Sequence, residues 1–557
     1  MTVRGGRTLV VLSAVLSLIV VLPPSASAYL PPPARYLIPA GDLNADGTED
    51  ALEHLFLYQY DDSGGKTRIS GVDGVDGTTL WTIESGGYSD IRAMGDLDGV
   101  PGDDVLLEEQ TSEPIPGGYQ TTTIFRALRG ADGGELWSRS YTGLYTLWVT
   151  VGSSEGSARL GSAYPADGAE DLNGDDTADL LVERHGAAYV YDGTADRFAE
   201  STIFEAVSGR TGQPIAVFSA TGASSPGVSW VPDFTGDGLT DVAVVSFSPE
   251  PTGGSAGGTV SVSAYPGTGG PPKWQREVDV LGYAYYLHGA DLDGDGFGDV
   301  LLESDAGKSR FDALSGVDGA TMWALDRARW KGHELAGDAD GDGGEDVFVF
   351  AFVRGGALPK WDAQLIGGSD GEAIWARALP SWPYTVGDAT GDGVVDLVST
   401  QPGARKGGAA PEKQRVARLL DGATGGLVWA RRLGKQQDVY PLRGDLDGDG
   451  NADLAVVSSI PADYGVYPIS YVPISGRSGR DLWTRAVVVE GGIRQLFVAD
   501  LLPADGVDLL ESGFAKSGAR FLRFGVGRAR AGATGAKLWR RVFDLASSPR
   551  AKRNSSY

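Results

Sequence analysis

The 557-residue chain holds 83 glycines, 29 prolines and 13 tryptophans, and only 22% of its residues are charged, which excludes a disordered polymer and indicates a folded, turn-rich protein. The absence of cysteine excludes a disulfide framework and a lipid-modified cysteine. The formal net charge of -27 argues against nucleic acid and anionic membrane surfaces as partners.

The first 28 residues are typical of a secretory signal. Arg4 and Arg7 precede an apolar run at about residues 9–22, and residues 26–28 (Ala-Ser-Ala) supply a small-residue cleavage site. A retained membrane anchor is the alternative, but the run is short for a span of ~20 residues. We therefore expect residues 1–28 to be removed and the product to be secreted and extracellular.

An acidic loop with aspartates at fixed positions recurs several times along the rest of the chain. In "DLDGDGFGDV", residues 291–300, aspartates stand at positions 1, 3, 5 and 9 and a glycine stands at position 6, which is the layout of a calcium loop. An EF-hand is excluded because position 12 is Leu302 and because β-branched apolar runs, such as residues 346–352, follow the loops in place of helices. The pattern predicts a cation loop between two strands.

Two signals alternate along the chain. The first position of the acidic loop recurs at Asp42, Asp96, Asp171, Asp233, Asp291, Asp338, Asp388, Asp445 and Asp500. After each loop comes a glycine turn that usually closes on tryptophan, as in "GVDGATMW" at residues 316–323. Repeats of this period predict propeller blades of four strands, with the cation loop between the first and second strands. We interpret the tryptophan as core between blades rather than as a ligand contact.

These signals predict an all-β fold, a single β-propeller over residues 29–545 that is followed by a basic tail at residues 546–557. Nine loops exceed the ~4 to 8 blades that propellers typically have. Two surplus blades could not shield their own edges, so we expect one closed ring of eight or nine blades.

The D-x-D-x-D-G-x-x-D loops resemble those of the FG-GAP or VCBS repeat family, which includes the integrin α-subunit propeller and many secreted bacterial proteins. The resemblance covers about residues 37–545, and the G-x-[ST]-G-x-x-x-W turns more weakly resemble those of quinoprotein-like propellers. It implies a calcium-bearing propeller, usually of seven blades, that acts as an interaction scaffold. No repeat shows a clear FG…GAP pair, which favours the bacterial VCBS-like branch over an integrin-like one.

We expect seven loops to bind Ca²⁺ as structural sites. Their predicted ligands are Asp42, Asn44, Asp46 and Asp50; Asp171, Asn173, Asp175 and Asp179; Asp233, Thr235, Asp237 and Asp241; Asp291, Asp293, Asp295 and Asp299; Asp338, Asp340, Asp342 and Asp346; Asp388, Thr390, Asp392 and Asp396; and Asp445, Asp447, Asp449 and Asp453. In the third loop Asp176 replaces the glycine of position 6. The loops at residues 96–104 and 500–508 lose position 5, and we expect little or no metal there.

Irregular insertions indicate where a partner binds. They occupy residues 108–123, 141–168, 248–259, 401–415 and 460–468, and carry Tyr119, Tyr145, Trp148, Tyr464, Tyr467, Arg405, Lys406, Lys413 and Arg415. We expect them to join second to third strands or blade to blade, on the face opposite the cation loops, and to bind an extracellular protein or glycan there. We expect a monomer.

An enzyme is the alternative that the sequence leaves open. The four histidines, His54, His185, His288 and His333, fall in different repeats without metal-ligand spacing, and no local nucleophile motif such as G-x-S-x-G stands out. Catalysis by residues spread over several blades, on an extracellular polysaccharide or with a quinone cofactor, is supported only by analogy with other propellers.

Overall fold

The structure is a computed structural model that describes residues 35–544 with interruptions, the longer of which are residues 58–65, 151–170, 250–257, 354–359, 402–414, 460–468, 502–506 and 516–523. The expected signal segment and basic tail lie outside the described residues. Within the described part the chain forms strands and no helix, and no helix there is long and apolar enough to cross a membrane.

The strands form nine four-stranded antiparallel sheets, each built from consecutive strands. Blades 1 to 3 contain β1 Arg35–Gly41, β2 Asp50–Leu57, β3 Lys66–Val72 and β4 Thr79–Gly86; β5 Tyr88–Gly95, β6 Asp104–Ile115, β7 Gly118–Leu128 and β8 Glu135–Gly143; and β9 Leu147–Thr150, β10 Leu180–Tyr191, β11 Asp196–Val207 and β12 Pro214–Ala220. Blades 4 to 6 contain β13 Ser224–Val231, β14 Asp241–Pro249, β15 Gly258–Tyr265 and β16 Trp274–Val280; β17 Tyr283–Ala290, β18 Asp299–Asp305, β19 Ser309–Leu314 and β20 Thr321–Arg327; and β21 Trp330–Gly337, β22 Asp346–Val353, β23 Lys360–Ile366 and β24 Ala373–Leu379. Blades 7 to 9 contain β25 Pro383–Thr385, β26 Leu397–Gln401, β27 Arg415–Leu420 and β28 Leu427–Leu433; β29 Gln437–Pro441, β30 Leu454–Ser459, β31 Ile469–Ile474 and β32 Val487–Val489; and β33 Ile493–Ala499, β34 Asp508–Ala515, β35 Phe524–Arg530 and β36 Lys537–Asp544.

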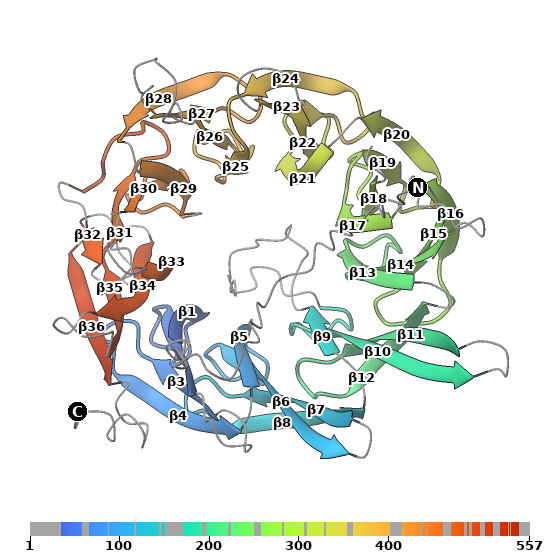
Figure 1. Ribbon diagram of the computed structural model, residues 1–557, viewed down its shortest axis with the longest axis horizontal. Coiled ribbons are helices and arrows are strands. Elements are labelled where there is room, and N and C mark those ends of the chain that lie inside the picture. Colours follow the sequence, from blue (N-terminus) through green and yellow to red (C-terminus); the bar gives the residue numbers. More distant parts are fainter. Residues whose placement is uncertain are drawn as a thin grey trace, which may run out of the picture. The chain divides into compact units, whose positions relative to one another are not determined.

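The nine sheets are the blades of one propeller (Figure 1). The first strand of each blade lies nearest the centre of the ring and the fourth lies at its outer edge. The predicted all-β propeller is therefore confirmed, at the upper of the two expected blade numbers. The acidic loops join first to second strands and the glycine turns join third to fourth strands, as the sequence predicts.

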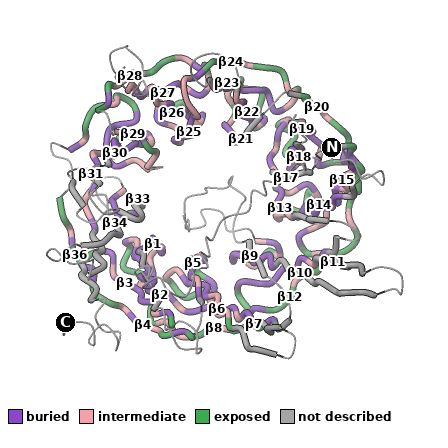
Figure 2. The backbone as a smooth tube through the Cα atoms, viewed as in Figure 1, coloured by how far each residue is buried: buried purple, intermediate pink, exposed green. Residues whose placement is uncertain are grey.

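The hydrophobic core lies between neighbouring blades. One cluster, for example, combines Val231, Val260 and Trp274 of blade 4 with Val300 and Leu302 of blade 5. Figure 2 shows buried residues along the inner and middle strands and exposed residues along outer strands such as β24 and β28. Both the first and the fourth strand are edge strands, but first strands of neighbouring blades, such as β13 and β17, lie against each other near the centre of the ring, whereas the fourth strands are spread along its rim.

A tryptophan on the fourth strand, or just before it in blade 8, joins most blades to the next one. Trp81 donates its indole N–H to the carbonyl oxygen of Gly130 at 2.5 Å, and its ring packs against Gly133, whose φ is +71°. The same bond recurs at Trp137, Trp274, Trp323, Trp375, Trp429, Trp483 and Trp539. The interpretation of these tryptophans as core between blades is confirmed. Blade 3 has Ala216 at this place.

The ring closes between blades 9 and 1 by the same contacts that join the other blades. Trp539 donates to the Gly74 carbonyl oxygen at 2.6 Å, and the Glu49 N–H donates to the Asp500 carbonyl oxygen at 2.7 Å. Leu37 and other residues of blade 1 share a core cluster with blade 9. Since both blades are built from consecutive strands, closure depends on these contacts rather than on strand exchange.

Candidate metal centres

The aspartate at position 9 anchors each acidic loop to its blade. Asp299 is fully buried, and its Oδ2 accepts the N–H of Leu292 at 3.0 Å while its Oδ1 accepts the N–H of Gly316 at 2.8 Å. It thus ties the start of the loop to the following glycine turn. The bond to the turn glycine recurs at Asp50, Asp104, Asp179, Asp241, Asp346, Asp396, Asp453 and Asp508.

Burial raises the pKa of these anchoring carboxyls. In the cation-free protein the pKa is about 7 for Asp299 and Asp453, since the cost of desolvating the charge exceeds the stabilisation from the backbone N–H groups. Neighbouring aspartates of the loop, such as Asp293 beside Asp299, raise it further. A bound cation would act in the opposite direction, because it favours the ionised form.

The aspartate at position 1 shapes the turn. Asp445 accepts the N–H groups of Gly448 at 2.7 Å, Asp449 at 3.1 Å and Gly450 at 2.6 Å. Gly450, at position 6, has φ +85°, a conformation that favours glycine. In the third loop Asp176 adopts φ +59° at this position, which aspartate tolerates better than most residues, so the turn survives the substitution.

Carboxylate oxygens converge in three of the expected loops. One oxygen from each of three aspartates lies within 4.8 Å of the others in the groups Asp291, Asp293 and Asp295; Asp338, Asp340 and Asp346; and Asp445, Asp447 and Asp453. Three like charges at this separation repel one another, and a cation bound among them would remove the repulsion.

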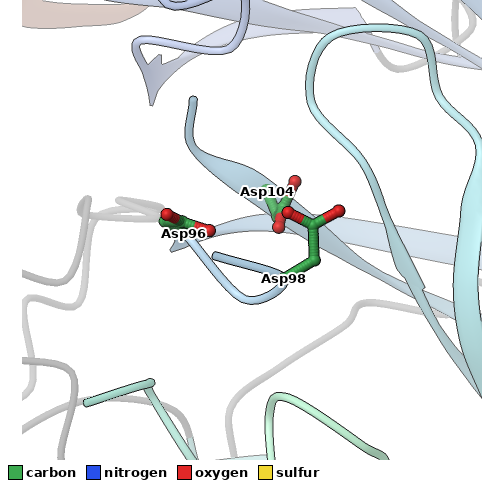
Figure 3. Close-up of side chains that lie close together, drawn as sticks. All are labelled: Asp96, Asp98 and Asp104. Atoms are coloured by element: carbon green, nitrogen blue, oxygen red, sulfur yellow. The ribbon is translucent and has the colours of Figure 1, made fainter. Parts of the chain in front are cut away.

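A fourth group, Asp96, Asp98 and Asp104, lies in a loop where we expected little or no metal (Figure 3). The missing position 5 therefore does not prevent three carboxylates from converging. Here, however, Arg129 donates from Nε to Oδ2 of Asp98 at 3.0 Å, and it supplies positive charge to the group.

The other four expected loops have asparagine or threonine at position 3, and their aspartates form no such group among the described residues. Asn173 donates its side-chain amide to Asp179 at 3.2 Å, and the Thr235 hydroxyl donates to Asp233 at 3.3 Å. At position 3 an asparagine or threonine donates a hydrogen bond to a carboxylate of the loop, whereas an aspartate at the same position would repel it. The loop at residues 500–508 lies partly outside the described residues, which include Asp500 and Asp508.

The insertions are placed by the strands that they connect. Residues 248–259, 401–415 and 460–468 fall between second and third strands of the sequence order, and residues 108–123 belong to the β6–β7 hairpin. Residues 250–257, 402–414 and 460–468 themselves lie outside the described residues. Residues 151–168 of the insertion at residues 141–168 lie outside the described residues, so the expectation for them stays a prediction.

Arg415 is the one predicted partner-binding residue whose side chain is described, and it is paired with Asp438 at 2.7 Å. The side chains of Tyr119, Tyr145, Trp148, Tyr464, Tyr467, Arg405, Lys406 and Lys413 lie outside the described residues.

The histidines lie in strands of separate blades, with His185 in β10 and His288 in β17. His54 and His333 are buried, and their ring nitrogens lie 2.8 Å from the Ser89 carbonyl oxygen and 2.7 Å from the Glu303 carboxylate, respectively. Burial lowers the pKa of His54. Each of these two contacts joins neighbouring blades, His54 of blade 1 to Ser89 of blade 2 and His333 of blade 6 to Glu303 of blade 5.

No protein-family profile matches the chain, and none of the curated proteins matches it. Among solved structures, the rhamnogalacturonan lyase YesW is 12% identical with a TM-score of 0.37 and covers 86% of this chain and 89% of its own. Sqt1 of Saccharomyces cerevisiae is 9% identical with a TM-score of 0.37 and covers 82% and 95%. A europium-containing methanol dehydrogenase is 11% identical with a TM-score of 0.30 and covers 76% and 85%. Similarity this remote carries no information about activity or ligand.

Proposed function

We propose that the protein is a secreted, calcium-binding β-propeller of the FG-GAP or VCBS type that acts as an extracellular binding scaffold. The observation that carries the proposal is the convergence of carboxylate oxygens within 4.8 Å at the same corner of several blades. The signal-like residues 1–28 support export, and the sequence spacing of the loops supports membership of this family.

Calcium is the cation that best fits these groups. Their charged ligands are carboxylates, which suit a hard cation, and no histidine or cysteine belongs to any of the four groups. Calcium also accepts neutral oxygen ligands beside carboxylates, in variable geometry, and so suits loops that supply three carboxylates. A cation bound in the loops at residues 291–299, 338–346 and 445–453 would stabilise a first-to-second connection that faces the neighbouring blade.

The scaffold role is supported by a difference in the length of the connections on the two sides of the blades. Except between β9 and β10, the first-to-second connections are short, whereas the second-to-third connections vary from the tight β6–β7 hairpin to residues 402–414 and 460–468. Variable connections on a rigid scaffold are where recognition is usually built. We assign partner binding to that side.

The test is a binding screen of the full chain against secreted proteins and cell-wall glycans, with and without calcium. Replacing residues 402–414 and 460–468 by tight turns keeps Arg415 and all acidic loops. We expect the doubly shortened variant to lose partner binding and to retain its response to calcium. Unchanged partner binding in this variant would contradict the assignment.

A further inference from the structure

Two tyrosines on neighbouring inner strands expose their rings beside each other. Tyr384 of β25 is 44% exposed and Tyr440 of β29 is 39% exposed, and within the described residues no other aromatic side chain is exposed. Their ring centroids are 6.3 Å apart with an interplanar angle of 43°. β25 and β29 are the first strands of blades 7 and 8 and lie nearest the centre of the ring (Figure 1).

A partly exposed ion pair flanks the two rings. Asp438 precedes Tyr440 by two residues on β29, and its carboxylate accepts from Arg415 of β27 at 2.7 Å. Both charged side chains retain part of their exposure, at 25% for Arg415 and 32% for Asp438. Burial and the Asp438 charge raise the pKa of Tyr440 while Arg415 lowers it, so both charges act on the phenol.

The position of the ion pair relative to the acidic loops follows from strand direction. Arg415 is the first residue of β27, which runs toward the glycine turn, and Asp438 is near the start of β29, which runs toward the acidic loop of blade 8. Both residues therefore lie at the strand ends remote from the acidic loops. This is the side to which we assign partner binding, and the inference rests on that part of the proposed function.

We propose that Tyr384, Tyr440, Arg415 and Asp438 form a binding site for a neutral sugar residue of an oligosaccharide. A sugar ring offers an apolar C–H face to the tyrosine rings and hydroxyl groups at its edge, which can accept from a guanidinium and donate to a carboxylate. Aromatic residues and arginine are also the side chains enriched where binding energy is concentrated.

Charge selects a neutral sugar over a charged one. Arg415 and Asp438 neutralise each other, so the site offers no net charge to a uronate or sulfate. The chain as a whole carries a net charge of -27, which repels acidic polysaccharides at a distance. A basic peptide would gain from that long-range field, and it is the competing class of ligand in the test.

The experiment measures binding of the full chain to neutral hexasaccharides of glucose, mannose, xylose and galactose, to an acidic oligogalacturonide, and to an oligolysine peptide. Isothermal titration calorimetry is the readout. We expect at least one neutral hexasaccharide to bind, and Tyr384→Ala and Tyr440→Ala each to weaken that binding at least tenfold. Tyr440→Phe keeps the ring and should stay within about threefold of the parent.

The matched control is Leu427→Ala. It removes a 58% exposed side chain from β28, the outer strand of the blade that holds Tyr384, and should leave sugar binding unchanged. No binding of any neutral hexasaccharide, equal binding by the tyrosine variants, or binding of the oligolysine alone would overturn the inference. Calcium-dependent melting of the same variants separates the two proposals, because the tyrosines belong to β25 and β29 and not to the predicted ligands of any acidic loop. A calcium response without sugar binding overturns only the sugar site, and the reverse result overturns only the metal sites.

Discussion

The Nε atom of Arg129 lies 3.0 Å from Oδ2 of Asp98 and brings a positive charge to the loop at residues 96–104. Arg129 begins the glycine turn of blade 2. The residues at the same place after the loops at residues 291–299, 338–346 and 445–453 are Ser315, Gly367 and Ser475. The guanidinium thus stands beside the one convergent carboxylate group whose loop lacks an acid at position 5.

Replacing Arg129 by serine should turn this loop into a cation site. Without the guanidinium, the carboxylates of Asp96, Asp98 and Asp104 still repel one another, and no positive side chain offsets this repulsion. A bound cation would then stabilise the loop more than it does in the parent protein. We expect equilibrium dialysis to give one more bound calcium per chain than the parent protein has. Arg126→Ser, which removes the ion pairs with Glu109 and Glu135 and touches no acidic loop, is the control. Equal stoichiometry in both variants and the parent would contradict the role of Arg129.

Replacing Asp447 by alanine should have opposite effects on stability with and without calcium. Burial, and then the charges of Asp449 and Asp445, raise the pKa of Asp447, which shows that its ionised form is disfavoured in the cation-free loop. After chelation the substitution should leave the melting temperature unchanged or raise it. In calcium it removes a ligand, and the affinity of that site should fall by roughly tenfold or more. A loss of stability of equal size under both conditions would show that Asp447 has only a structural role.

The pH dependence of stability should also reverse on adding calcium. Asp50, Asp179, Asp299 and Asp453 have pKa values of about 7 in the cation-free fold, well above those of the unfolded chain. Between pH 4 and 7 the folded state holds more protons than the unfolded state, so the stability of the chelated protein should decrease as the pH rises through this window. With calcium, which competes with protons for the same carboxylates, the melting temperature should instead increase with pH. Parallel pH profiles in EDTA and in calcium would exclude this linkage.

Changing Trp81 to phenylalanine should loosen the junction between blades 1 and 2. The ring remains largely apolar, but the bond to Gly130 is lost and a buried carbonyl is left unsatisfied, which costs roughly 1–3 kcal/mol. The melting temperature should fall, and protection of amides in β4 from hydrogen exchange should fall with it. Trp361→Phe is the control. The ring of Trp361 contacts Phe352 of its own blade and Trp382 of the segment between β24 and β25. An equal loss in both variants would show that ring size, and not the bond between blades, is what matters.

Blade architecture was predictable because its two signals are local. The spacing from Asp291 to Asp299 and the turn that ends at Trp323 mark two corners of a blade, and their alternation orders the strands without knowledge of any distant contact. The number of blades was less certain, since closure depends on Trp539 meeting Gly74 from the opposite end of the chain.

The missed features depend on contacts between separate strands. Arg129 and Asp98 belong to different connections of one blade, and Tyr384 and Tyr440 belong to different blades, so no sequence spacing brings them together.

The central claim is that the acidic loops bind calcium and that this binding stabilises the propeller. Its most direct test is the calorimetric melting temperature of the full chain after exhaustive chelation, followed by titration with calcium and, separately, magnesium. A cation that binds only the folded state stabilises it by about 2.7 kcal/mol per site at a hundredfold excess over its Kd. The account predicts that EDTA lowers the melting temperature and that calcium restores it at lower concentration than magnesium does. A melting temperature that responds neither to exhaustive chelation nor to added calcium would contradict the account.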